Sequence, residues 1–138
     1  MLYAMDRAWW DKYIRSAAAE FSGHLYTCSD GVYGLPSTGA HHYQNSGAGA
    51  IAFAARRGAK RIILLGYDCR HTGGKTHWHG DHPPELANAG LVGEWPEHFA
   101  KLDRFLKMNK GPEIINATPN SRLSLWQKRS LSEALCAP

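Results

Sequence analysis

Apolar residues recur along this chain at helical spacing in some segments and in short continuous runs in others. Within residues 7–21, the side chains of Trp10, Tyr13 and Ile14 fall on one face of a helix. Four large aliphatic residues at 62–65, flanked by glycine and charged residues, are typical of a strand buried on both faces of a parallel sheet. The whole pattern predicts helices over Arg7–Phe21, Ser46–Arg57, Trp95–Met108 and Ser130–Leu135, and strands over Leu2–Met5, His24–Cys28, Lys60–Gly66 and Glu113–Ala117.

The predicted elements alternate along the chain, with a strand before each helix. Alternation of this kind indicates parallel strands joined by crossover helices. We therefore expect an α/β fold, a small Rossmann-like three-layer domain with a mostly parallel sheet of about four strands. The length of 138 residues suits one domain, so residues 1–138 are expected to form a single unit.

Composition narrows the class of protein. With 43% hydrophobic and 20% charged residues, the chain is typical of globular proteins and not of disordered ones. No apolar run approaches the roughly 18 residues of a membrane span, and the N-terminus lacks the pattern of a signal peptide. Three widely spaced cysteines form no CxxC pair, which indicates a cytoplasmic protein with reduced thiols. The net charge of +4 permits anionic ligands but does not indicate nucleic acid.

The segment 45–49, which reads NSGAG, leads into the second predicted helix and has the residue types of an anion site. A small polar residue caps the first N–H groups of a helix, and nearby glycine lets a ligand approach the backbone. Residues 31–67 contain basic side chains and no Asp or Glu, which suits a phosphate. We predict ligand binding at Asn45, Ser46 and Gly47. The alternative is an ordinary helix cap with tight packing at small residues.

Polar residues also follow two of the predicted strands directly. Asp68 comes after the aliphatic strand, and Asn116, Asn120 and Ser121 follow the last strand. Because ligands of open parallel sheets bind outside the carboxyl ends of the strands, we expect these side chains at one edge. There Asp68 can orient a ribose hydroxyl, a metal ion or a catalytic histidine, or it only caps a turn. The other three bind a polar ligand or form a turn themselves.

The segment 77–82, which reads HWHGDH, lies in a long polar loop over residues 69–93. Loops of this length inside a compact domain are often functional. Imidazoles and a carboxylate at this spacing can bind zinc or another transition metal, and the candidate ligands are His77, His79, Asp81 and His82. The order of residues matches the metal motif of metallo-β-lactamases. In that family the motif directly follows an apolar strand and further His and Asp ligands lie downstream, whereas here no apolar strand precedes it directly and only His98 follows. We therefore do not expect that family.

The same loop has two other interpretations. One of His77, His79 and His82 can act as a general acid or base, because imidazole titrates near neutral pH. Together with Asp68, these histidines are the candidate catalytic residues. The alternative is a surface loop fixed by its own hydrogen bonds, Trp78 and neighbouring prolines.

Several segments together resemble one group of proteins. Residues 45–51 and 58–68, the latter reading GAKRIILLGYD, resemble the "SG…A…A…lGakkIyLlGyD" core of the bacterial lipo-oligosaccharide sialyltransferases. The same core is found in the related uncharacterised domains of the archaeal hydroxymethylpterin pyrophosphokinase and flagellin-glycosylation type. Residues 114–123 resemble the "iyN.sp.S.L" segment of that group. The loop 72–83 and the opening 2–6 are similar to its phage and prophage members.

The resemblance implies a transferase-like domain that acts on or binds a nucleotide sugar or a related phosphorylated ligand. In those sialyltransferases the fold binds a cytidine nucleotide sugar, and a histidine of the loop region acts as base. Carried over by position, Ser46 and Gly47 would lie by the phosphate or sugar. Asn116, Asn120 and Ser121 would lie by the nucleotide or its phosphate, and one of the three loop histidines would be the base.

One departure from the group matters for function. Its members usually begin with a strand and a glycine-rich turn that cradles the nucleotide, and this sequence starts after that point. We expect an N-terminally shortened domain whose exposed sheet edge is covered by a second copy or a partner chain. This departure favours one alternative function, a non-enzymatic phage-type accessory or structural protein in the host cytoplasm. The loop gives another alternative, a metal-binding protein using His77–His82. No covalent cofactor is expected, and a divalent metal is the one cofactor that the loop suggests.

Overall fold

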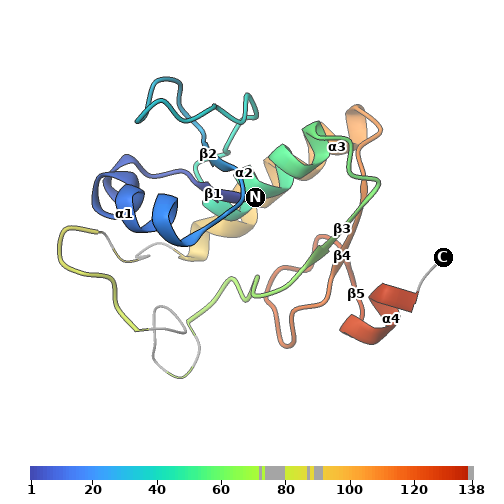
Figure 1. Ribbon diagram of the computed structural model, residues 1–138. Coiled ribbons are helices and arrows are strands. Elements are labelled where there is room, and N and C mark those ends of the chain that lie inside the picture. The colour runs from blue at the N-terminus through green and yellow to red at the C-terminus, as the bar shows by residue number, and fades with distance from the viewer. Residues whose placement is uncertain (72, 74–79, 87, 89–91, 137–138) are drawn as a thin grey trace.

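The secondary structure follows the predicted order. The computed structural model describes residues 1–71, 73, 80–86, 88 and 92–136 (Figure 1). Within them the helices are α1 (Arg7–Glu20), α2 (Ser46–Arg56), the short 3-10 helix η1 (Val92–Glu94), α3 (Trp95–Met108) and α4 (Leu131–Cys136). The strands are β1 (Leu2–Ala4), β2 (Leu25–Thr27), β3 (Arg61–Leu64), β4 (Glu113–Asn116) and β5 (Gln127–Lys128). Every predicted helix and strand is present, and β5 is the one strand of the described residues that was not predicted.

The strands pair in parallel, as predicted, but they form two small sheets. β1 pairs with β2, and β3, β4 and β5 form the second sheet in that order. The prediction of one sheet with about four strands is therefore corrected. The two short N-terminal strands pack through aromatic rings onto α2. The ring centroids of Tyr3 and Tyr26 lie 6.4 and 4.7 Å from that of Phe53.

The three-stranded sheet carries apolar contacts on both faces. On one face α2 and α3 run side by side towards the same end of the molecule (Figure 1), and their buried side chains join those of the sheet in one core. This core comprises Ala48, Ile51, Ala52, Leu64, Cys69, Phe99, Leu102, Leu106, Ile114 and Leu123. On the other face, Ala134 of α4 packs with Ile115 and Ile63. Because successive strand residues face opposite ways, the continuous apolar runs of β3 and β4 supply both faces.

The connection from β4 to β5 crosses the sheet without a helix. Residues 117–126 bring Leu123 into the core, and the ring centroids of Trp126 and Phe99 lie 6.0 Å apart. The indole Nε1 of Trp126 donates to Asp103 Oδ1 at 2.9 Å. β5 itself consists of two exposed polar residues, so the apolar pattern gave no sign of it.

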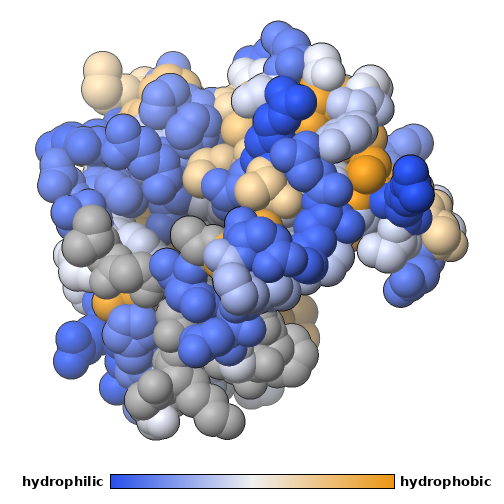
Figure 2. Space-filling view, turned by 90° about the vertical axis from the view of Figure 1, so that its left-hand side faces the viewer, coloured by the Kyte–Doolittle hydropathy of each residue, from blue (hydrophilic) through white to orange (hydrophobic). Residues whose placement is uncertain are grey.

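The helix α1 is fixed by one large side chain. Trp10 is buried, and its indole Nε1 donates to the backbone oxygen of Ala4 at 3.1 Å, which ties the helix to the end of β1. The face of the molecule that carries α1 is mostly hydrophilic, with hydrophobic colour in small separate areas (Figure 2). Within the described residues, no helix is long and apolar enough to cross a membrane.

Candidate functional site

A cavity of about 520 Å³ lies where the chain leaves β1 and β3 and enters α2 and α3. This is the carboxyl edge of the parallel strands, where ligands of open α/β sheets bind. Its lining brings together five residues singled out from the sequence, which are Asn45, Ser46, Gly47, Asp68 and His82. The other lining residues are Met5, Asp6, Gln44, Gly66, Tyr67, Cys69, Asn88, Trp95 and Phe99.

The N-terminus of α2 forms one wall of this cavity. Asn45 is the N-cap in an extended conformation, and its Oδ1 accepts from the N–H of Ala48 at 3.0 Å. The backbone oxygen of Asn45 accepts from Gly49 at 2.9 Å. In the part of the chain that the structure describes, the N–H groups of Ser46 and Gly47 have no hydrogen-bond partner. Two free donors at the positive end of a helix dipole are suited to an anion.

The turn before α2 depends on two histidines that the sequence analysis left aside. Tyr43 and Gln44 have the positive φ angles 51° and 57°. Their backbone N–H groups donate to Nδ1 of His41 and of His42 at 2.9 and 3.0 Å, and the two imidazoles stack with centroids 5.4 Å apart. Both rings therefore accept at Nδ1. The adjacent HH pair is the sequence feature that marks this turn.

Tyr67 joins the end of β3 to the start of α2. Its hydroxyl donates to the backbone oxygen of Gly47 at 3.2 Å, and burial raises the pKa of Tyr67 to about 12. The hydroxyl is therefore protonated at neutral pH and serves as a donor. A side chain at Gly47 would meet this ring, since an added Cβ would lie 2.9 Å from Tyr67 Cε1. Glycine at position 47 thus permits the close approach of the two elements.

Asn116 and Ser121 form a buried network behind the cavity wall. Asn116 Nδ2 donates to Ser121 Oγ and to the oxygen of Leu123, both at 3.0 Å, and its Oδ1 accepts from the N–H of Thr118 at 3.0 Å. Ser121 Oγ donates to the oxygen of Tyr67 at 2.5 Å. The network holds the segment that carries Asp68, so the two side chains position the wall. Their predicted contact with a ligand stays a prediction.

Asn120 lies apart from the cavity of Ser46 and Asp68, and Asn116 lines the same separate cavity as Asn120. The φ angle of Asn120 is 56°, and this separate cavity, of about 620 Å³, lies beside β5 and α4. The described geometry therefore does not bring Asn120 to the cavity of Ser46 and Asp68. Its amide stays a predicted ligand contact, at a different place on the molecule.

The cavity also contains ionisable side chains from several elements. Asp6 follows β1, Asp68 follows β3, and His82 reaches the cavity from the long loop. The backbone N–H of His82 donates to Asn88 Oδ1 at 2.8 Å, which orders the loop at this point. Asp6 was not predicted, although it follows a predicted strand just as Asp68 does. Two carboxylates and an imidazole at one edge can bind hydroxyl groups and move a proton.

Cys69 is placed at the cavity but is not a ready nucleophile. Burial, and secondarily the charge of Asp68, raise the pKa of its thiol to about 11. At neutral pH the thiol is therefore protonated, and a thiol is a poor nucleophile. Its φ angle of 50° is unusual for a residue with a side chain and marks the sharp turn after β3.

The predicted metal ligands are only partly described. His77 and His79 lie outside the described residues. Asp81 and His82 together line a groove beside Trp9 and Tyr13 of α1. Among the residues that are described, no group of three or more His, Cys, Asp or Glu side chains is placed to hold a metal ion. Metal binding through the loop stays a prediction.

Comparison with protein-family models, with curated proteins and with solved structures gives no match to this chain.

Proposed function

We propose that this chain is a transferase-like domain that binds a nucleotide sugar or a related phosphorylated ligand in the cavity at the carboxyl edge. The observation that carries the proposal is the pair of free N–H groups at Ser46 and Gly47, which line the same cavity as Asp6, Asp68 and His82. A volume of about 520 Å³ is in the range of small-molecule sites.

The proposed roles follow from the chemistry of each group. The phosphate accepts from the N–H groups of Ser46 and Gly47, and the carboxylates of Asp6 and Asp68 accept from sugar hydroxyls. His82 takes the proton of an acceptor hydroxyl while the new glycosidic bond forms, and the nucleotide phosphate leaves with the electron pair of the broken bond. His77 and His79 are the alternative bases.

We also propose that the two sheets belong to one Rossmann-like arrangement. Parallel pairing throughout supports this, because parallel strands need crossover connections. So does the packing of α2 and α3 on one face of β3–β4 and of Ala134 from α4 on the other. An experimental structure with a bound nucleotide would test it by showing whether β1 lies next to β3.

The phosphate contact can be tested by removing one backbone donor. Ser46→Pro deletes the N–H at the first helical position, where proline is well tolerated, and Asn45 before it is already extended. Ser46→Ala keeps the N–H and is the matched control. We expect titration calorimetry with cytidine monophosphate and its sugar conjugates to show at least tenfold weaker binding to Ser46→Pro and less than a threefold change for Ser46→Ala.

Two outcomes would overturn the proposal. The first is the absence of binding at millimolar concentration for every member of a panel of nucleotides and nucleotide sugars. The second is equal affinity of Ser46→Pro and wild type while both proteins have the same melting temperature. Binding with no transfer to any acceptor sugar would instead favour the non-enzymatic alternative.

A further inference from the structure

A second cavity, of about 430 Å³, lies at the opposite edge of the three-stranded sheet. It is formed by the loop before α2, the C-terminal ends of α2 and α3, and the residues that lead into β3 and β4. The lining residues are Gly39, Ala40, His41, Tyr43, Ala52, Ala55, Arg56, Gly58, Ala59, Lys60, Phe105, Leu106, Asn109, Lys110, Gly111 and Pro112. They include three cations and no Asp or Glu.

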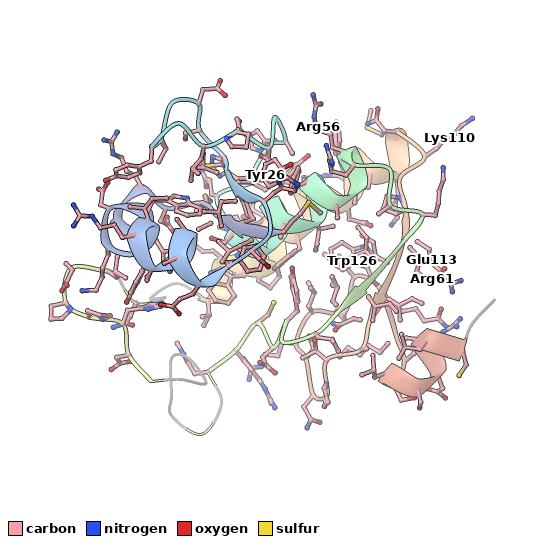
Figure 3. The ribbon with its side chains drawn as sticks, in the orientation of Figure 1. Tyr26, Arg56, Arg61, Lys110, Glu113 and Trp126 are labelled. Carbon is pink, nitrogen blue, oxygen red and sulfur yellow. The ribbon has the colours of Figure 1, made fainter. Side chains whose placement is uncertain are left out.

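The three cations come from different segments, are exposed, and have no partner among the described residues. Arg56, Lys60 and Lys110 make no ion pair and no side-chain hydrogen bond with any described residue. Arg56 and Lys110 both lie at the end of the molecule where α2 and α3 terminate (Figure 3). The carboxylate of Glu113, next to the lining, is already held by Arg61 at 2.6 Å. This cavity therefore has an excess of positive charge and, within the part of the chain that is described, no anion to balance it.

The lining places one of these cations beside a glycine and includes aromatic rings. The guanidinium of Arg56 lies against Gly39, where an added Cβ would be 3.2 Å from Arg56 Nε. The rings of Tyr43 and Phe105 belong to the same lining, and Phe105 is 52% exposed. Cations beside helix C-termini also offset the helix dipole. That role explains Arg56, in the last turn of α2, and extends to Lys110, which directly follows the C-cap of α3, but it does not explain Lys60.

We propose that this cavity binds the phosphate groups of a small phosphorylated molecule. Guanidinium and ammonium groups are the side chains that bind phosphate oxygens through charge-assisted hydrogen bonds. The concave shape and limited volume favour a small molecule over a polymer. The site is separate from the cavity at Ser46, and the inference does not depend on the transferase proposal.

Inorganic pyrophosphate is the probe for the test, titrated calorimetrically at low ionic strength. The cavity variant is Arg56→Gln/Lys110→Gln. The matched control is Arg57→Gln/Arg104→Gln, which removes the same net charge from exposed cations outside the lining. We expect at least tenfold weaker binding to the cavity variant and less than a threefold change in the control.

Two further arms separate the possible sources of the phosphate. Pyrophosphate binding to Ser46→Pro shows whether the phosphate occupies the other cavity. Binding of a short single-stranded oligonucleotide of mixed sequence shows whether the cavity prefers a polymer. We expect Ser46→Pro to keep the binding that Arg56→Gln/Lys110→Gln loses, and the oligonucleotide to bind more weakly than pyrophosphate.

Four results would overturn the inference. They are no pyrophosphate binding to the wild type, less than a threefold loss in the cavity variant, an equal loss in both double variants, and tighter binding of the oligonucleotide than of pyrophosphate. If Ser46→Pro alone weakens pyrophosphate binding, the cavity variant shows less than a threefold loss. That result would assign the phosphate to the other cavity.

Discussion

The two edges of the three-stranded sheet use polar side chains in opposite ways. At the carboxyl edge, Asn116, Ser121 and Tyr67 bond to one another or to nearby backbone, and their polar atoms hold the loops in place. The opposite edge, where the chain enters β3 and β4, is the amino edge. There Arg56 and Lys110 line the second cavity and bond to no described residue. Hydrogen bonds within the protein define one edge, whereas the cavity at the other edge is lined by cations without a partner among the described residues.

This difference determines what each edge responds to. A buried hydrogen-bond network is costly to break, because the groups left behind are unsatisfied and cut off from water. Exposed charges contribute little to stability and are screened by salt. The carboxyl edge should therefore be sensitive to truncation of a single side chain, whereas changes at the amino edge should alter ligand binding and leave the fold intact.

The largest effect is expected at Asn116. Asn116→Ala removes three hydrogen bonds and leaves Thr118 N–H and the oxygen of Leu123 buried without that partner. We expect a loss of about 3 to 4 kcal/mol in the free energy of unfolding by urea. The control is Asn120→Gly, which keeps the positive φ and should cost less than about 1 kcal/mol. Equal losses in both variants would contradict the assignment of Asn116 to the network.

An intermediate effect is expected from Tyr67 at alkaline pH. Its pKa is about 12 in the folded protein and near 10 in the unfolded chain, so the folded state keeps a proton that the unfolded state loses. Stability should therefore fall as pH rises from about 10 towards 12. Below pH 10, Tyr67→Phe should be about 1 kcal/mol less stable, because it lacks the hydrogen bond to Gly47.

Urea unfolding between pH 8 and 12 measures this comparison. The wild type should lose about 2 to 3 kcal/mol relative to Tyr67→Phe as the pH rises through this range. Cys69, whose pKa burial raises to about 11, is present in both proteins and contributes equally. A difference between the two proteins that stays constant up to pH 12 would contradict the buried position of the hydroxyl.

The smallest effect is expected at the amino edge. Arg61→Gln removes the cross-strand pair with Glu113, whose Oε2 lies 2.6 Å from Arg61 Nε. We expect a change of about 0.5 kcal/mol in the free energy of unfolding, because both side chains are partly exposed. Glu113→Gln should behave in the same way. A loss above about 2 kcal/mol in either variant would show that this edge also depends on a specific bond, and the contrast between the edges would disappear.

The elements with strong apolar spacing were predictable from the sequence. The helix Trp95–Met108 was predicted with the bounds that the structure has, and the aliphatic run at 62–65 indicated a parallel strand. The short strand at Gln127–Lys128 was not predictable, because its two polar residues carry no apolar signal. The division into two sheets was also missed, because the apolar pattern along the chain does not show which strands pair with one another.

For the candidate site, the sequence indicated where the cavity lies better than it indicated what each residue does there. The rule that ligands bind beyond strand ends indicated Asp68, the helix-cap pattern indicated Ser46, and both residues line one cavity. The same rule did not show that the side chains of Asn116 and Ser121 are buried. The order of residues after a strand does not indicate whether a side chain points into the protein or into the cavity. The unpaired cations at the opposite edge come from three segments, and only the fold brings them together.

The turn held by the two stacked histidines touches both cavities. His41 and Tyr43 line the basic cavity, whereas Gln44 and Asn45 line the cavity at the carboxyl edge. A ligand that reshapes this turn from one side therefore alters the other side, and such coupling is reciprocal by thermodynamic necessity. A ligand that changed the affinity of the other cavity through this turn would have its own affinity changed by the same factor, although the two ligands never meet.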